Sequence, residues 1–463
     1  MLIKRAKFTL LFVIFTISTL IIHGGIKDDL PIWLSGSILH ARVVDYKDDS
    51  ILTDFAILNS KMKKEYGKDV KNWNRAAHRK LNREIYKNEL EVDENVKWQT
   101  YPSAIRFPIY IGQKLDQLFC FLFNKKANYS IHINTIYFLL SCLVLFSILL
   151  WIYIEFGIIS ALLVALNSIF FIFNFGWFDR IWYNLLPMTV LFLATPKLFN
   201  SKHGKLYLFL IVVVLAYFIS INTYEWVPTL FVSLAMPVFY YSVKFDYSFL
   251  NIIKWSSLVS FAAIIGLILG LMTHFKVLTN YSSSEYAKTL MLHRVQQRTY
   301  NNETDDTKMN KNNRQINAAK TPLVKVLRIN LNKTRGLFNV TFDNYLYAVG
   351  ICWLLTFLFI RKKIPRHIFK KYSLICILMV LGFIGGISRL VVFKSHAAIT
   401  AHQRFVMDSF NYPYDLFTPI FLITTLGLLV YSLVSNEKYK KILEKYFFGF
   451  HEADDTIINK SIT

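Results

Sequence analysis

The sequence predicts an all-α polytopic membrane protein, and three observations carry that prediction. The chain of 463 residues is 54% hydrophobic and 16% aromatic, with a mean hydropathy of +0.36, which is well above the values of soluble globular proteins. Most of its apolar stretches run for about 20 residues, the length of a helix that crosses a bilayer. Because hydrocarbon requires every backbone amide to be bonded internally, stretches of that length favour helices over barrel strands.

Window hydropathy predicts about ten transmembrane helices. The first apolar run is expected to remain as a membrane helix, because no small-residue cleavage pattern follows it. The fourth contains Pro187 and Pro196 and is expected to be kinked or partly re-entrant. The predicted spans are residues 8–25, 132–154, 157–175, 182–197, 205–222, 226–243, 254–274, 345–361, 372–393 and 416–434.

These spans leave two large external loops. In the first loop, mixed apolar and charged residues at helical spacing predict surface helices over residues 51–64 and 73–86. The predicted parts of the chain are the first transmembrane helix (1–25), the first external loop (26–131), transmembrane helices two to seven (132–274), the second external loop (275–344), transmembrane helices eight to ten (345–434) and a cytoplasmic tail (435–463).

Lysine and arginine gather at alternate connectors, which the positive-inside rule places in the cytoplasm together with both termini. The Lys/Asn/Ile/Phe-rich composition is typical of an AT-rich bacterial genome, so the expected location is the bacterial inner membrane. These connectors and anionic lipid headgroups explain much of the net charge of +23 without a nucleic-acid partner. The external loops are also basic, which suits an anionic ligand. The basic clusters lie at residues 4–7, 197–205, 244–254, 361–371 and 438–441.

Asp48 and Asp49 stand side by side just beyond the first span, on the predicted external side. Desolvation and a neighbouring carboxylate both raise the pKa of an aspartate, so such a pair suits removal of a proton from a hydroxyl. The alternative is that the two residues cap a surface helix beginning near Ser50. The pair could also hold a divalent cation, Mg²⁺ or Mn²⁺. No metal site is predicted elsewhere, because His396 and His402 are six residues apart, which fits no standard ligand spacing.

Three short motifs occur in the order of a known enzyme layout. Asp48-Asp49-Ser50-Ile51 follows the first span, Gln99 to Ala104 with Pro108 precedes the second, and Gln403-Arg404-Phe405 with Pro413 precedes the last. This layout resembles the GT-C superfamily of membrane glycosyltransferases. The two large external loops are similar to those of serotype-converting glucosyltransferases that act on O-antigen, a part of the lipopolysaccharide of the cell envelope. One departure is the cytoplasmic tail, where family members often have a longer external portion.

The resemblance implies a polyprenyl-phosphate-linked sugar as donor, a hydroxyl of a cell-surface glycan or lipid as acceptor, and inversion at the sugar. In that family the acidic motif of the first external loop supplies the base, which here would be Asp48 or Asp49. Asp179 and Glu225, each at an external end of a span, could assist the base or contact the acceptor. The alternative is that both are interfacial anchors beside Trp and Tyr at headgroup depth.

Four cations are candidates for binding the donor phosphate: Arg404, Arg389, Lys394 and Arg106. Arg389 stands out because it lies within the apolar stretch 387–393, where a charge is costly unless it meets an anion or snorkels to the interface. A planar guanidinium matches phosphate oxygens well. Snorkelling alone explains Lys394.

Two other functions remain open. An O-antigen or capsule repeat-unit polymerase also has about ten to a dozen spans and uses external arginines rather than an early acidic pair. A transporter would show repeat symmetry, broken helices and ionisable residues at mid-membrane, and the sequence shows no repeats and almost no such charges. The external arginines that keep the polymerase open are Arg294, Arg298, Arg314, Arg328 and Arg335.

Overall fold

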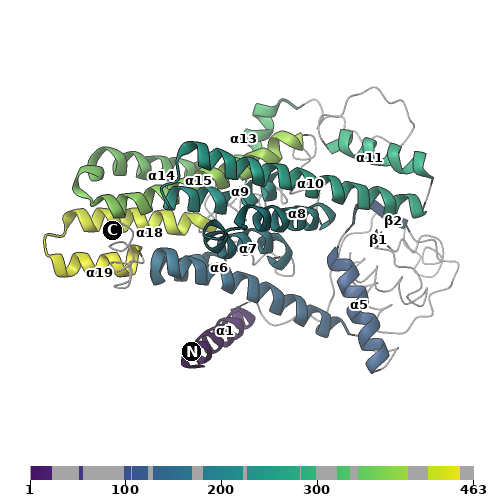
Figure 1. The fold of residues 1–463 in the computed structure, drawn as a ribbon, viewed down its shortest axis with the longest axis horizontal. Coiled ribbons are helices and arrows are strands. Elements are labelled where there is room, and N and C mark those ends of the chain that lie inside the picture. Colours follow the sequence, from purple (N-terminus) through teal and green to yellow (C-terminus); the bar gives the residue numbers. More distant parts are fainter. Residues whose placement is uncertain are drawn as a thin grey trace.

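The computed structural model describes residues 2–22, 52–55, 99–105, 107–123, 129–168, 181–222, 227–281, 283–298, 321–333, 342–394 and 416–448. Within these residues the chain is helical apart from one short two-stranded sheet. The long helices lie side by side along the longest axis of the molecule (Figure 1). Six helices of this part are long and apolar enough to cross a membrane, so length and composition mark the chain as an integral membrane protein.

A helix lies at each predicted span, although residues 23–25 and 169–175 of these spans lie outside the described residues. The six that meet the length and hydropathy requirements are α6, α8, α9, α10, α15 and α18, so the total of ten crossings stays a prediction. The helices at the predicted spans are α1 (Leu2–Ile22), α6 (Ser130–Asn167), α7 (Ile181–Phe199), α8 (Gly204–Asn222), α9 (Val227–Lys244), α10 (Phe249–Tyr281), α14 (Phe342–Leu355) with the π-helix η5 (Thr356–Ile360), α15 (Arg366–Val392) and α18 (Leu416–Leu433).

The second and third predicted spans are one helix with a break. α6 is 38 residues long, and its backbone leaves helical geometry at Gly157, where φ is 84° and ψ is 175°. Side chains with a Cβ are crowded at positive φ, so glycine is the residue that allows the chain to turn there. The break lies two residues after Glu155, at the boundary between the predicted spans 132–154 and 157–175. α7 runs as one helix through Pro187 and Pro196.

Helices α8 and α10 approach each other closely at two glycines. A Cβ added at Gly266 would lie 2.5 Å from the carbonyl oxygen of Val213, and one added at Gly270 would lie 2.4 Å from the Cβ of Ser220. The two glycines are four residues apart, and this small-residue spacing lets membrane helices pack backbone to backbone.

The core lies where α6, α7, α9 and α18 meet, and aromatic rings fill it. The ring of Trp151 packs 4.0 Å from that of Phe192 and 5.4 Å from that of Tyr240, and Phe192 lies 5.9 Å from Phe417. Edge and tilted contacts of this kind add stability beyond buried area. On the outer surface, large apolar side chains remain exposed, for example Phe261 at 59%, as expected of helices that face lipid.

The bundle has two distinct ends (Figure 1). At the first, named the basic end, Lys244 pairs with Glu155, Lys370 with Asp246 and His367 with Glu444. These pairs join connectors that the sequence assigned to one side of the membrane. The basic end also carries the 3₁₀ helix η6 (Arg361–Lys363) and α19 (Glu437–Phe448).

The second, named the strand end, carries the sheet and the helices outside the bundle. The sheet consists of β1 (Leu52–Phe55) and β2 (Gln99–Ile105). α5 (Phe107–Leu122) follows β2, and α11 (Ser284–Arg298) follows α10. α13 (Leu323–Lys333) precedes α14.

The prediction of a surface helix over residues 51–64 is wrong at its start, because residues 52–55 form β1. The same strand excludes the suggested surface helix beginning near Ser50, which Asp48 and Asp49 would have capped. β1 exists because it pairs with β2, more than forty positions later along the chain, and helical spacing within a short window contains no information about such a partner. The second predicted surface helix, residues 73–86, lies outside the described residues.

Candidate functional site

Of the eight residues that the sequence singles out, the described part of the chain holds Arg389 and Lys394. The other six lie outside the described residues: Asp48, Asp49, Arg106, Asp179, Glu225 and Arg404. The structure does describe helices and strands that are adjacent in sequence to several of these six residues.

The sheet places the segment that follows the acidic motif beside the second sequence motif. β1 begins three residues after Asp49, and β2 covers the segment Gln99–Ile105 that precedes Arg106. The strands are antiparallel, with Asp54 opposite Thr100 and Leu52 opposite Ile105. Residues 52–55 and the 99–105 segment are therefore hydrogen-bonded neighbours, although more than forty positions separate them in the sequence.

β2 also attaches the two-stranded sheet to the bundle. It contacts α8, α10 and α11. Directly after it, α5 is held against α6 by a hydrogen bond that the Tyr137 hydroxyl donates to the carbonyl of Pro108. Cys120 and Phe119 of α5 pack with Tyr137 and Ile133 of α6 in a separate apolar cluster.

An open groove of about 830 Å³ lies between the same three helices that contact β2. Its walls are almost entirely apolar, with Val214 from α8, Met272 from α10 and Met291 from α11 among them. Thr273 donates a hydrogen bond to the hydroxyl of Tyr217 at 3.4 Å. Lys276, one turn beyond Met272 toward the strand end, is exposed and brings a positive charge to the groove.

Arg389 lies at this same end. The hydroxyl of Thr229, near the start of α9, donates to the carbonyl of Gly385 at 2.8 Å, so α9 and α15 run antiparallel. Since α9 ends at Lys244 in the basic end, Arg389 lies in the opposite half of the bundle. Its side chain is only 1% exposed and is among the largest fully buried ones. The backbone N–H of Phe393 donates to the Arg389 carbonyl at 2.8 Å, and half-buried Lys394 follows.

Sequence reasoning missed two buried acids. Asp116 of α5 is fully buried, with the Cys120 sulfur 3.9 Å from its Oδ2. No motif pointed to it. Glu155 is 6% exposed. It could have been found, because it lies in the short predicted connector at residues 155–156 and Lys244 directly follows a predicted span that ends on the same side.

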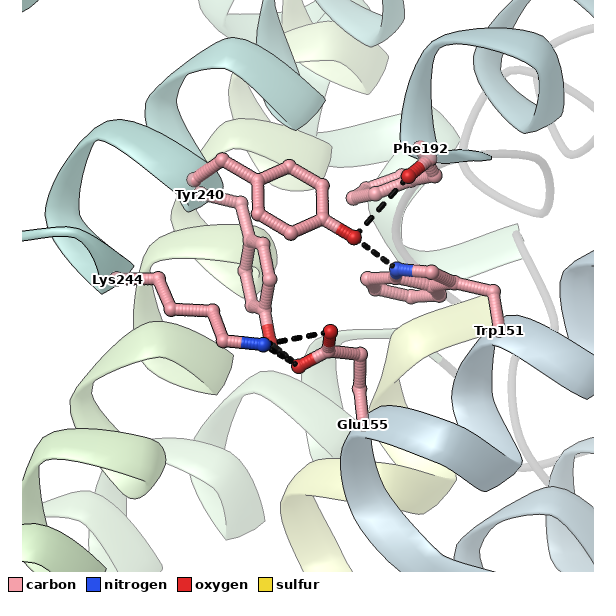
Figure 2. A network of polar contacts seen from close by, with 6 residues as sticks. Trp151, Glu155, Phe192, Tyr240 and Lys244 are labelled. Carbon is pink, nitrogen blue, oxygen red and sulfur yellow. Dashed lines mark hydrogen bonds and ion pairs between the residues drawn. The ribbon is translucent and has the colours of Figure 1, made fainter. Parts of the chain in front are cut away.

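Glu155 forms the centre of a polar network inside the bundle (Figure 2). The ammonium of Lys244 donates to both of its carboxylate oxygens at 2.7 Å, and the Tyr240 hydroxyl donates to Oε2 at 2.7 Å. Beside it, Trp151 Nε1 donates to the Tyr241 hydroxyl at 2.8 Å, which donates to the Phe192 carbonyl at 3.0 Å. These bonds tie α6, α7 and α9 together at the basic end, far from the groove.

Within the described residues, no group of three or more His, Cys, Asp or Glu side chains is placed to hold a metal ion. No protein-family model, curated protein or solved structure matches the chain.

Proposed function

We propose that this protein is a membrane glycosyltransferase. It moves a sugar from a polyprenyl-phosphate donor to a hydroxyl of a cell-surface glycan or lipid at the strand end. The observation that carries the proposal is that β2, which pairs with the strand following Asp48 and Asp49, contacts α8, α10 and α11, the helices that line the apolar groove.

The groove suits the lipid part of such a donor. Its apolar walls open to the lipid-facing surface of α8 and α10, where Val214 and Met272 are each 63% exposed. An isoprenoid chain entering from the bilayer would meet apolar side chains along this path. Lys276 is placed to meet the phosphate at the end of the chain.

Covalent geometry supports an acidic group at the same end. Asp49 is three residues from Leu52, and three residues span at most about 11 Å. Leu52 is opposite Ile105, the residue before Arg106. The acidic pair and one candidate phosphate-binding cation are therefore attached to the two adjacent strands.

The proposed reaction is a single displacement. Asp48 or Asp49 takes the proton from the acceptor hydroxyl, whose oxygen forms a bond to the anomeric carbon. The bond from that carbon to the phosphate oxygen breaks, and the electron pair leaves with the polyprenyl phosphate. One displacement inverts the anomeric centre, as in inverting glycoside hydrolysis.

The leaving phosphate needs positive charge. Lys276, Arg389 and Lys394 lie in the half of the bundle that carries the groove, and Arg106 and Arg404 are the remaining candidates. Preorganised cations of this kind stabilise charge that develops on a leaving group. A divalent cation at the acidic pair would act on the same phosphate.

The acidic pair is tested in a strain that lacks the gene and is complemented with variants. Mass spectrometry of surface glycans should show one missing sugar in the deletion strain. Asp48→Asn or Asp49→Asn should fail to restore it, whereas Asp246→Asn at the basic end should restore it. Restoration by both Asp48→Asn and Asp49→Asn would contradict the proposal.

The groove is tested with two lysines of one helix. Lys276→Gln should slow sugar transfer, while Lys254→Gln, an exposed lysine at the other end of α10, should not. Equal effects would remove the groove from the proposal. The polymerase alternative predicts a different phenotype, namely shortened surface polysaccharide with unchanged sugar content and sensitivity to replacement of Arg294 or Arg298.

A further inference from the structure

α19 presents three different stripes along its length. Its buried and half-buried residues, including Leu443, Phe447 and Phe448, form one stripe against the bundle. Tyr439, Ile442 and Tyr446 form a second, and these apolar side chains are 59%, 43% and 44% exposed. The third stripe is the exposed set Lys438, Lys441 and Lys445, with the same spacing of three and four residues. Residues at that spacing share one face of a helix.

The first stripe fixes α19 on the bundle. Phe447 lies so close to Gly427 of α18 that a Cβ on the glycine would be 2.9 Å from the ring. The Tyr431 hydroxyl donates to Glu444 at 3.0 Å. α19 therefore runs back along α18, as Figure 1 also shows. Gly427 is six residues before the end of α18, so α19 reaches back about 9 Å along that helix.

A second basic segment lies beside α19. His367, in the first turn of α15, is 3.8 Å from Glu444 of α19. Just before it, η6 consists of Arg361, Lys362 and Lys363, all exposed. Arg361 covers the rings of Phe357 and Phe369, at 5.3 and 5.5 Å, so this segment too combines cations with apolar surface.

The acids described at this end already have basic partners. Glu437 pairs with Lys440 at 2.8 Å, Glu444 with His367, Asp246 with Lys370, and Glu155 with Lys244. Among the described residues, the three lysines of the third stripe form no such ion pair. The positive charge of the stripe and of η6 is thus available for an external anion.

We propose that the basic end is a binding site for anionic phospholipid. Lys438, Lys441 and Lys445, with η6, hold the lipid phosphates, while the exposed stripe of Tyr439, Ile442 and Tyr446 rests on the acyl chains. Because the charged stripe and the apolar stripe are adjacent on α19, one lipid can contact the lysines with its headgroup and the apolar side chains with its acyl chains. This lipid site does not depend on the proposed transfer reaction, and its test is independent of sugar transfer.

The test is native mass spectrometry of the full-length protein in detergent with added phosphatidylglycerol or phosphatidylcholine. Wild-type protein should prefer phosphatidylglycerol. Each lysine near an anionic surface contributes about fivefold in affinity, so Lys438→Gln/Lys441→Gln/Lys445→Gln should weaken phosphatidylglycerol binding about 100-fold. The triple Lys→Arg variant should bind as wild type does. Thermal unfolding of each variant verifies that it is folded.

A charge-matched control separates the site from net charge. Lys288→Gln/Lys325→Gln/Arg328→Gln removes three cations from α11 and α13 and should leave binding unchanged. Equal weakening by both triple variants would overturn the proposal, as would unchanged binding by the α19 variant. Glycerol phosphate without acyl chains should not displace the lipid, and displacement at equal concentration would show that the phosphate alone is recognised.

Discussion

The ion pair between Glu155 and Lys244 allows a prediction about which partner costs more to remove. The two partners differ in exposure, with 8% for the glutamate side chain and 36% for the lysine. Lys244→Met leaves a buried carboxylate that, among the described residues, still accepts a hydrogen bond from the Tyr240 hydroxyl. Glu155→Gln leaves a lysine that can extend to water, and the amide oxygen still accepts from Tyr240.

The magnitudes follow from that asymmetry. Removing one partner of a fully buried pair costs about 3–5 kcal/mol. Because water already reaches Lys244, we discount this to about 2–3 kcal/mol for Lys244→Met. Glu155→Gln should cost about 1 kcal/mol, since a lysine that snorkels needs no partner. The double variant should be nearly as stable as Glu155→Gln alone, because no unpaired carboxylate remains.

The assay is reversible unfolding of the purified protein in mixed micelles with increasing denaturing detergent, arranged as a double-mutant cycle. The expected coupling is about 2–3 kcal/mol, because the double variant should lose little more stability than Glu155→Gln alone. If Glu155→Gln cost more than Lys244→Met, or if the two effects were additive, the asymmetry argument would be refuted. The Lys254→Gln variant, an exposed lysine elsewhere at this end, gives the reference for loss of one charge.

Three further predictions concern packing, the α6 break and topology. Gly270→Leu should destabilise the protein by about 1–3 kcal/mol through overpacking, whereas Gly350→Ala, with no atom within 4 Å of its added Cβ, should be neutral or stabilising in the same unfolding assay. Gly157→Ala should cost about 1–2 kcal/mol, because φ is 84° there, and an unchanged unfolding midpoint would disprove that constraint. Reporter fusions at Lys205 and Asp306 should report opposite sides of the membrane, and the same side for both would invalidate the predicted topology.

The helices were largely predictable from sequence, because burial in lipid selects long apolar runs that a local window detects. The positions at which the helices end were less predictable. α10 continues to Tyr281, seven residues beyond its predicted end, since polar residues extend a helix once it has left the hydrocarbon. The predicted division between two spans at residues 155–156 corresponds to the break at Gly157, where the backbone leaves helical geometry. Glycine is the residue that adopts the positive φ found there without crowding a Cβ.

The candidate site was less predictable because its parts meet through non-local contacts. The residues that follow the acidic pair and the 99–105 segment form paired strands, and periodicity within a short window cannot reveal the register between such distant segments. Buried Asp116 had no motif, and its burial follows from packing of α5 on α6. Arg389 was identifiable because a guanidinium in an apolar run is costly wherever it lies.

The two ends of the bundle use charge in opposite ways. At the basic end, Glu155, Asp246 and Glu437 each pair with a lysine and Glu444 lies beside His367, which leaves surplus positive charge on exposed stripes of α19 and η6. At the strand end, the proposed reaction involves only a few of the described cations. Among them, Arg389 is buried and Lys276 lines the groove. Diffuse exposed charge suits many interchangeable headgroups, whereas a buried guanidinium suits one phosphate held in one position. A lipid that binds at the basic end and a lipid-linked substrate in the groove would therefore be distinguished by placement of charge rather than by its amount.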